Sequence, residues 1–181
     1  AYHHTDIVYM SKDQEVLRDV EHEVKEEATQ GIVCTDRNKM SLQGLLEYAN
    51  TVDLAEIKDV IQRQIEMNSR ISQEGLDNAW GAQIGKTILG NWGHDVRTEA
   101  CAAAVAGSDA RMSGCPLPVV INSGSGNQGI TVTMPVLVYA REWKISEEKM
   151  YRALLVSNLV SIYIKHYIGA LSAFCGAVSA A

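Results

Sequence analysis

The spacing of apolar residues predicts helices over most of the chain beyond residue 40. Leu54, Ile57, Ile61 and Ile65 recur at helical intervals, and charged residues occupy the other faces of the same segment. Serine or aspartate stands at the start of several such segments, as is typical of helix N-caps. Helices are expected at 41–50, from 53 onward, at 72–89, at 95–111, from 146 to about 166, and from about 170 to the end of the chain.

Two further segments have the composition of β-strands. Residues 6–10 and 15–17 flank the polar stretch 11–14, which predicts a short N-terminal hairpin with a polar turn. Residues 130–139 are rich in β-branched side chains, so local propensity predicts a strand there, although Pro135 argues against a central one.

Small residues in two of the expected helices favour close helix contact. Gly75, Gly81 and Gly85 recur within 72–89, and the stretch 100–106 is rich in alanine. Without large side chains, two helix backbones can approach one another closely. We therefore expect a mainly α fold with a small N-terminal β element (α+β), in which a helical bundle surrounds a Gly-rich loop.

The chain is expected to divide near residue 40. Its 181 residues suffice for one domain with a small appendage. Residues 1–40 would be a short appendage of β-structure and loop, the remnant of a larger N-terminal domain. Residues 41–181 would be a helical domain truncated at its C-terminus, because the chain has no initiator methionine and its last helix has no cap.

Composition and charge exclude several classes of function. The formal net charge is −6 and the basic residues form no stripe, which disfavours a nucleic-acid partner. Four widely spaced cysteines without a Cys-x-x-Cys motif argue against a secreted disulfide framework and predict a cytoplasmic protein with reduced thiols. Charged and polar residues interrupt the apolar stretch 153–181, so a membrane span is not expected.

The segment 121–135 is the strongest candidate for a binding site. Glycines, serines and side-chain amides lie there between two apolar runs, so the backbone can turn tightly while N–H groups and short polar side chains face one small space. This composition favours a small anion such as a carboxylate or phosphate, and a plain connecting turn is the alternative. Arg111 could bind a carboxylate through two hydrogen bonds, unless Asp109 or another acidic residue neutralises the charge of this arginine. The candidate substrate-binding residues are Arg111, Ser123, Gly124, Ser125, Gly126 and Asn127.

Three motifs together resemble a known family. They are SDARM at 108–112, NSGSGNQGIT at 122–131 and LSAFC at 171–175. In this order they resemble the L-cysteine desulfidase-like family, which is related to the alpha chain of iron–sulfur L-serine dehydratases. The resemblance implies a lyase that converts L-cysteine or L-serine to pyruvate and ammonia with release of sulfide or water. It leaves open which of the two amino acids is the substrate.

The resemblance also implies a cofactor. In that family a cysteine of the LSAxC segment and two cysteines of a C-terminal motif are expected to hold a 4Fe-4S cluster. Cys175 is the matching residue here, and the cysteine motifs near both ends of family members are missing. The chain therefore looks like a central fragment that lacks the complete cluster and is inactive alone. Without the resemblance, a lone cysteine in an Ala-rich segment would be taken as a small buried hydrophobe.

The general base is not assigned by the sequence. Histidine is a common general base at neutral pH, so His4, His94 and His166 are candidates, but nothing in the sequence places any of them beside the Gly-rich loop. The alternative to a lyase is a non-catalytic helical binding or assembly module. In that case the loop is a packing corner and the Ala-rich helices mediate self-association into a homo-oligomer.

Overall fold

The chain divides into two compact units, and each is described by itself. The computed structural model describes residues 9–19, 36–169 and 173–181. The units are Ala1–Lys39 and Met40–Ala181.

The described part of the first unit contains a β-hairpin. Strands β1 (Tyr9–Lys12) and β2 (Glu15–Asp19) are antiparallel. Asp13 and Gln14 form the turn with positive φ angles of 50° and 74°, as two-residue hairpin turns require. The predicted hairpin is confirmed, but the polar stretch 11–14 is not all turn, because its first two residues pair with β2. A short 3-10 helix, η1 (Arg37–Lys39), follows within this unit.

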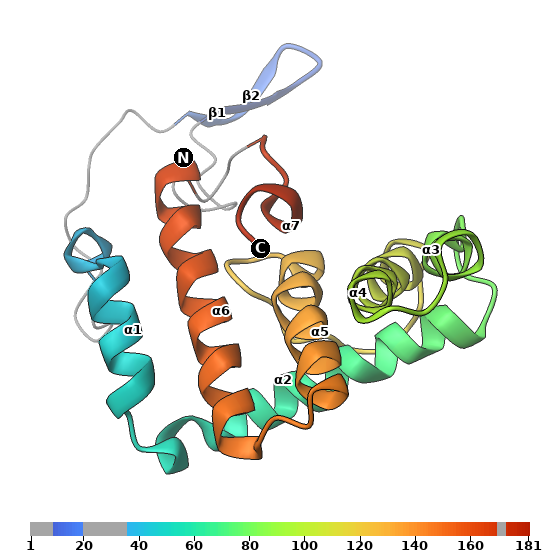
Figure 1. Ribbon diagram of the computed structural model, residues 1–181. Coiled ribbons are helices and arrows are strands. Elements are labelled where there is room, and N and C mark those ends of the chain that lie inside the picture. Colours follow the sequence, from blue (N-terminus) through green and yellow to red (C-terminus); the bar gives the residue numbers. More distant parts are fainter. Residues whose placement is uncertain (1–8, 20–35, 170–172) are drawn as a thin grey trace. The chain divides into compact units, whose positions relative to one another are not determined.

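The second unit is helical, so the mainly α fold with a small N-terminal β element is confirmed. Figure 1 shows α5 between α6 and α4, with α2 running across these three helices. The described helices of this unit are α1 (Leu42–Thr51), α2 (Leu54–Asp77), α3 (Ile84–Trp92), α4 (Val96–Met112), α5 (Gly126–Glu142), α6 (Glu147–Ile168) and α7 (Gly176–Ser179).

Two helices begin at the predicted caps Ser41 and Asp53, and Asp95 caps a third; α6 begins after Ser146 as predicted, without a side-chain cap bond. The side chains of Ser41, Asp53 and Asp95 accept N–H groups from the first turns of α1, α2 and α4 at 2.9–3.1 Å. These bonds satisfy donors that a helix start leaves unpaired. Hydrogen bonds from the backbone and hydroxyl of Thr98 lower the pKa of the Asp95 carboxyl, because they stabilise its charged form.

The prediction of one helix over 72–89 is wrong. Helix α2 continues to Asp77, and the chain then turns through residues 78–83 before α3 begins. Gly81 and Gln83 adopt positive φ angles of 50° and 52°. Asp109, a residue of α4, stabilises the break between α2 and α3. Its carboxylate accepts hydrogen bonds from the N–H group of Ala82 in the turn and from that of Ile84 at the start of α3, each at 3.2 Å. A contact between distant segments thus overrides the local helical pattern.

The strand predicted over 130–139 is also wrong, because these residues belong to α5. Ser125 caps this helix through a hydrogen bond from the N–H of Gln128 to its Oγ at 3.2 Å. Helices on several sides bury α5, and that packing outweighs the weak strand preference of β-branched side chains. Pro135 lies inside the helix, where it removes one backbone donor.

The C-terminal prediction is wrong in length. Helix α7 is only four residues long, and Cys175 immediately precedes it instead of lying within a long helix. Residues 170–172 lie outside the described part. The helix that begins at Glu147 extends to Ile168, close to the predicted end near 166.

Glycines allow α2 and α3 to pack closely against α4, as the small residues indicated. A Cβ atom on Gly75 would lie 2.1 Å from the backbone oxygen of Ala106, and one on Gly85 would lie 2.7 Å from that of Ala102. Gly81 instead lies in the turn between α2 and α3. The main hydrophobic core joins α2, α4, α5 and α6 around Ile71, Ala103, Ala110, Ile130 and Leu154.

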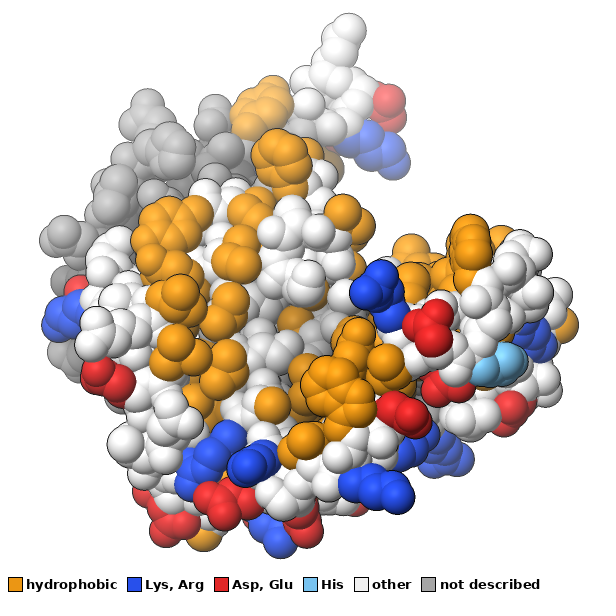
Figure 2. All heavy atoms as spheres, viewed as in Figure 1, with side chains coloured by type: hydrophobic (Ala, Val, Ile, Leu, Met, Phe, Trp, Pro, Cys, Tyr) orange, Lys and Arg blue, Asp and Glu red, His pale blue; other side chains and the backbone are white. Residues whose placement is uncertain are grey.

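Hydrophobic side chains also gather on the surface. Figure 2 shows them along α6 and at the C-terminal end of α5. A groove of about 450 Å³ lies there, lined by residues that include Tyr139, Trp143 and Met150. Among the helices described, none combines the length and apolar content needed to cross a membrane.

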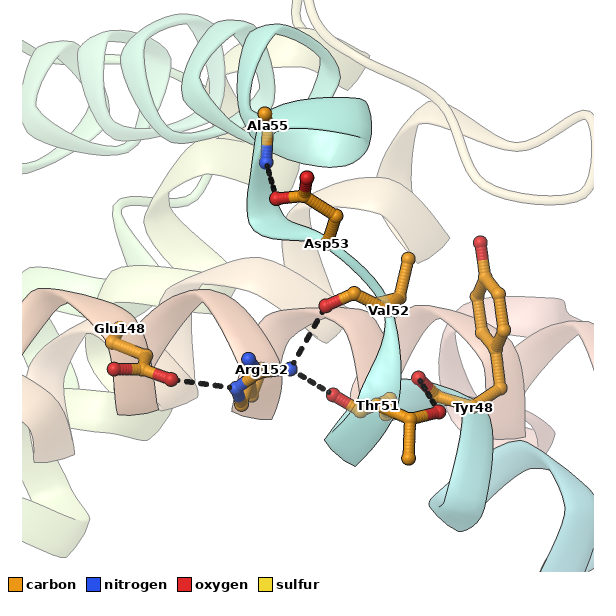
Figure 3. A network of polar contacts seen from close by, with 8 residues as sticks. Tyr48, Thr51, Val52, Asp53, Ala55, Glu148 and Arg152 are labelled. Carbon is orange, nitrogen blue, oxygen red and sulfur yellow. Dashed lines mark hydrogen bonds and ion pairs between the residues drawn. The ribbon is translucent and has the colours of Figure 1, made fainter.

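Arg152 joins α6 to the end of α1 (Figure 3). Its Nη1 atom donates to the carbonyl oxygens of Ala49 at 2.8 Å and Val52 at 3.3 Å, and its Nε atom pairs with Glu148 at 3.1 Å. The carbonyls are at the C-terminal end of α1, where helical oxygens lack partners and attract cations.

We expect Arg152→Met to lower the free energy of unfolding of the chain by about 1–2 kcal/mol, since it removes charge-assisted hydrogen bonds from a partly exposed site. Urea unfolding measures this value. Arg63→Met is the matched control, because Arg63 is exposed on α2, and its effect should stay within about 0.5 kcal/mol. Equal effects of the two substitutions would contradict the role given to Arg152.

Candidate functional site

The centre of the candidate site is a tight turn, residues 122–125, that leads directly into α5. Asn122 and Ser125 exchange backbone hydrogen bonds at 3.0 and 2.9 Å. Between them Ser123 and Gly124 have positive φ angles of 47° and 82°. We call this segment the 122–125 turn. It corresponds to the beginning of the Gly-rich segment that the sequence singled out.

The start of α5 presents unpaired backbone donors beside this turn. The N–H groups of Gly126 and Asn127 lie in the first helical turn, where no intrahelical acceptor exists. They have no hydrogen-bond partner within the described ranges. The positive end of the helix dipole lies at the same place. This geometry is suited to a small anion.

Arg111, on the last turn of α4, reaches the same helix start. Its Nη1 atom donates to Asn127 Oδ1 at 3.1 Å, and its guanidinium packs so tightly on Gly126 that a Cβ there would lie 2.3 Å from Nε. The Asp109 carboxylate instead accepts N–H groups near α3, so it does not pair with Arg111. No carboxylate in the described part of the chain forms an ion pair with this guanidinium. The exposed Arg111 is thus placed to meet an anion from outside.

Cys175 lies near the start of α5 as well. It directly precedes Gly176, and a Cβ on Gly176 would lie 2.0 Å from Oε1 of Gln128. Figure 1 shows α7 beside the N-terminal end of α5, in agreement with the contacts between these helices. The thiol is exposed rather than enclosed. The structure therefore places six candidate residues together, Arg111, Ser123, Gly124, Ser125, Gly126 and Asn127, and places Cys175 next to Gly176, which contacts Gln128 near the start of α5. Their roles in binding stay predictions.

A buried amide network, which the sequence did not indicate, fixes the 122–125 turn. Gln128 is fully buried, and its Nε2 atom donates to Asn122 Oδ1 at 3.1 Å and to Ser161 Oγ at 2.6 Å. The Asn122 amide donates to Asn158 Oδ1 at 2.9 Å. Asn158 and Gln64 then exchange amide hydrogen bonds at 3.0 and 2.9 Å. The turn is thus held from both α6 and α2, which limits its freedom to move.

Two atoms of this region lack partners. Ser123 Oγ and Gln128 Oε1 are buried and make no hydrogen bond among the residues described. Buried polar atoms are paired in the great majority of cases, so unpaired ones near a surface turn are consistent with a site for a ligand.

The described residues do not form a complete metal site. No group of three or more histidine, cysteine or acidic side chains occurs among them with the spacing to hold a metal ion. Cys175 could supply one thiolate, but the donor set of a 4Fe-4S cluster needs about three or four cysteines. Cys101 is exposed elsewhere on α4, and Cys115 is buried in the core. Cys34 lies outside the described residues.

The described histidines lie on different segments of the chain. His94 precedes α4 and lies 3.5 Å from Glu99, at the end of that helix opposite Arg111. Seventeen residues of α4 separate the two ends, a distance of about 25 Å. His166 lies on the last turn of α6, beside Tyr167. His4 lies outside the described residues. No general base is assigned.

Comparison with known proteins identifies the family. Residues 11–181 match the family of the serine dehydratase alpha chain. Similar proteins include a UPF0597 protein of Lachnoclostridium phytofermentans, 47% identical over 98% of this chain and 42% of the relative. Others are UPF0597 proteins of Desulfitobacterium hafniense, 45% identical over 99% of this chain and 41% of that protein, and of Finegoldia magna, 49% identical over 98% and 41%.

The chain therefore spans about two fifths of the length of these relatives. No solved structure matches it significantly. The match over residues 11–181 and the level of identity confirm the resemblance found in the sequence motifs: the chain belongs to the serine dehydratase alpha chain family.

Proposed function

We propose that the full-length protein is a cytoplasmic lyase that converts L-serine or L-cysteine to pyruvate and ammonia, releasing water or sulfide. In this proposal the present chain supplies the part of the active site that holds the substrate. Family membership supports the type of reaction. The observation that carries the assignment of the site is the contact of Arg111 with Asn127 at the unpaired N-terminus of α5.

The site residues fit the shape and charge of such a substrate. Both amino acids carry an α-carboxylate, which needs hydrogen-bond donors and positive charge. The N–H groups of Gly126 and Asn127 and the guanidinium of Arg111 supply both on one side of the site. A carboxylate fixed in this way orients the α-carbon and the leaving group for elimination. The buried amides behind the turn keep these donors in place.

The proposal includes a 4Fe-4S cluster in the full-length protein, with Cys175 as one ligand. Such a cluster would act there as a Lewis acid. The remaining thiols would come from parts of the protein outside this chain, because the described residues provide no complete set of ligands. The isolated chain is accordingly proposed to be inactive. An exposed thiol beside the start of α5 supports Cys175 in this role.

Pyruvate release tests the reaction. The full-length protein, purified without oxygen, should release pyruvate from L-serine or L-cysteine and show broad visible absorbance. The 181-residue chain alone should do neither. Turnover by the isolated chain would contradict the proposed need for outside thiols. A colourless and inactive full-length protein would contradict the lyase and favour a non-catalytic assembly module.

Cys175→Ser tests the cluster ligand separately. In the full-length protein we expect this substitution to remove most of the visible absorbance, because a serine oxygen replaces thiolate sulfur poorly. Cys101→Ser is the matched control, since Cys101 is also exposed but lies on α4, and it should leave the spectrum unchanged. An unchanged spectrum in Cys175→Ser would remove Cys175 from the proposed ligand set.

A further inference from the structure

Lys165 on α6 is a mostly covered side chain, and no described residue pairs with its ammonium. Its exposed fraction is only 7%. Within the residues that the structure describes, its ammonium makes neither a hydrogen bond nor an ion pair. A cation on a mostly covered side chain gains stability from a nearby anion. The groups that surround Lys165 therefore indicate what kind of anion its ammonium would bind.

Two contacts fix how α6 lies against α5. Ser157 donates to the carbonyl oxygen of Val132 at 2.8 Å, and Ser161 accepts from Nε2 of Gln128 at 2.6 Å. Four residues forward along α6 thus correspond to four residues back along α5. The two helices are antiparallel neighbours, and each step of four residues is about one helical turn.

The next step of this register reaches the candidate site. Lys165 follows Ser161 by one turn on the same face of α6. The same register, carried one turn beyond Gln128, passes the first residue of α5, Gly126, so Lys165 lies toward the start of α5. The 122–125 turn itself bends back along α6, because Asn122 bonds to Asn158. Helix α5 lies between α6, which carries Lys165, and α4, which carries Arg111 (Figure 1).

Two buried atoms at the same place also lack partners. Gln128 is fully buried, its Nε2 atom is held by Ser161, and its Oε1 atom is unpaired in the described part of the chain. Ser123 Oγ, in the 122–125 turn itself, is buried and equally unpaired there. A hydroxyl can donate to an anion, and an amide oxygen can accept from an ammonium. Gln128 Oε1 faces Gly176 of α7, so Ser123 Oγ and Lys165 are the two groups available to an anion.

We propose that Lys165 binds the substrate's carboxylate together with Arg111 and the start of α5. The proposal rests on the proposed function for the choice of an amino acid, whereas the anion site itself follows from the geometry. Two cations with two backbone donors can satisfy both oxygens of a carboxylate. Lys165 is a binding residue in this proposal and takes no proton.

The test uses the full-length protein and L-alanine, which has the carboxylate and ammonium of the substrates but no leaving group. Binding is read from the ligand-induced rise in melting temperature, which requires only cooperative unfolding. We expect Lys165→Met to raise the dissociation constant of L-alanine by at least about tenfold. Lys165→Arg keeps the positive charge and should bind more tightly than Lys165→Met. Lys149→Met, an exposed lysine at the other end of α6, is the matched control and should bind normally.

The outcomes separate the two proposals. If the wild-type protein binds L-alanine and releases pyruvate, but Lys165→Met binds L-alanine equally well, the role of Lys165 is wrong and the lyase stands. If inorganic phosphate stabilises the wild-type protein but not Lys165→Met, while L-alanine has no effect and no pyruvate forms, the anion site stands and the lyase is wrong. If neither L-alanine nor phosphate stabilises the wild-type protein, the anion site is wrong.

Discussion

Arg111→Met in the full-length protein should lower kcat/KM for pyruvate release by about 100-fold, which corresponds to about 2.7 kcal/mol of lost stabilisation. Arg111 donates to Asn127 and faces the unpaired N-terminus of α5, so the substitution removes a charged donor from the proposed carboxylate site. Hydrogen bonds to charged groups contribute about 1.5–3 kcal/mol. Steady-state kinetics with L-serine and L-cysteine give the measurement.

The control for Arg111 lies on the same helix. Arg97 is exposed in the first turn of α4, at the end opposite Arg111. Arg97→Met changes the same side chain in the same way, and it should leave kcat/KM within about twofold of the wild-type value. A similar loss in both variants, or no loss in Arg111→Met, would show that Arg111 does not hold the substrate.

Gly75→Ala should destabilise the helical unit by about 2–3 kcal/mol. The added Cβ would lie 2.1 Å from the backbone oxygen of Ala106, so α2 and α4 would have to move apart. Neither backbone can shift without disturbing the core around Ile71 and Ala103, and overpacking of this kind costs more than the better helix propensity of alanine returns. The free energy of unfolding in urea measures the effect.

Gly90→Ala is the matched control for Gly75. Gly90 also lies inside a helix, α3, but no atom lies within 4 Å of the position that its Cβ would take. Alanine there should raise the free energy of unfolding by about 0.5–1 kcal/mol, because only the helix propensity changes. Stabilisation by both substitutions would mean that α2 and α4 do not pack as closely as described.

The parts of the fold that depend on neighbouring residues were predictable. Ser41, Asp53 and Asp95 cap their helices through bonds that span two or three residues, which local spacing can indicate. The N-terminal hairpin is similarly local, with its turn at Asp13 and Gln14.

The parts that depend on distant residues were not predictable in the same way. The break between α2 and α3 is stabilised by Asp109, which is 25 and 27 positions away from its two partners. The segment 130–139 is helical because α2, α4 and α6 surround it, although its β-branched side chains favour a strand. In both places tertiary packing outweighed a local preference.

In the candidate site too, features that depend on neighbouring residues were predictable and features that depend on distant residues were not. The composition of the 122–125 turn and the nearby Arg111 could be recognised in the sequence because glycine, serine and amide residues cluster there. Lys165 was missed, and Gln128 was recognised only as one amide of the Gly-rich segment, because their packing depends on how α6 lies against α5. One feature of the sequence could have indicated Lys165. It is a polar stripe on a helix with many apolar residues, formed by Asn158, Ser161 and Lys165.

A crystal structure of the full-length protein with L-alanine would show whether the start of α5 holds a substrate carboxylate. We expect carboxylate oxygens about 2.7–3.2 Å from the N–H groups of Gly126 and Asn127 and from the Arg111 guanidinium. L-alanine bound elsewhere, with these donors facing only water, would rule out this site.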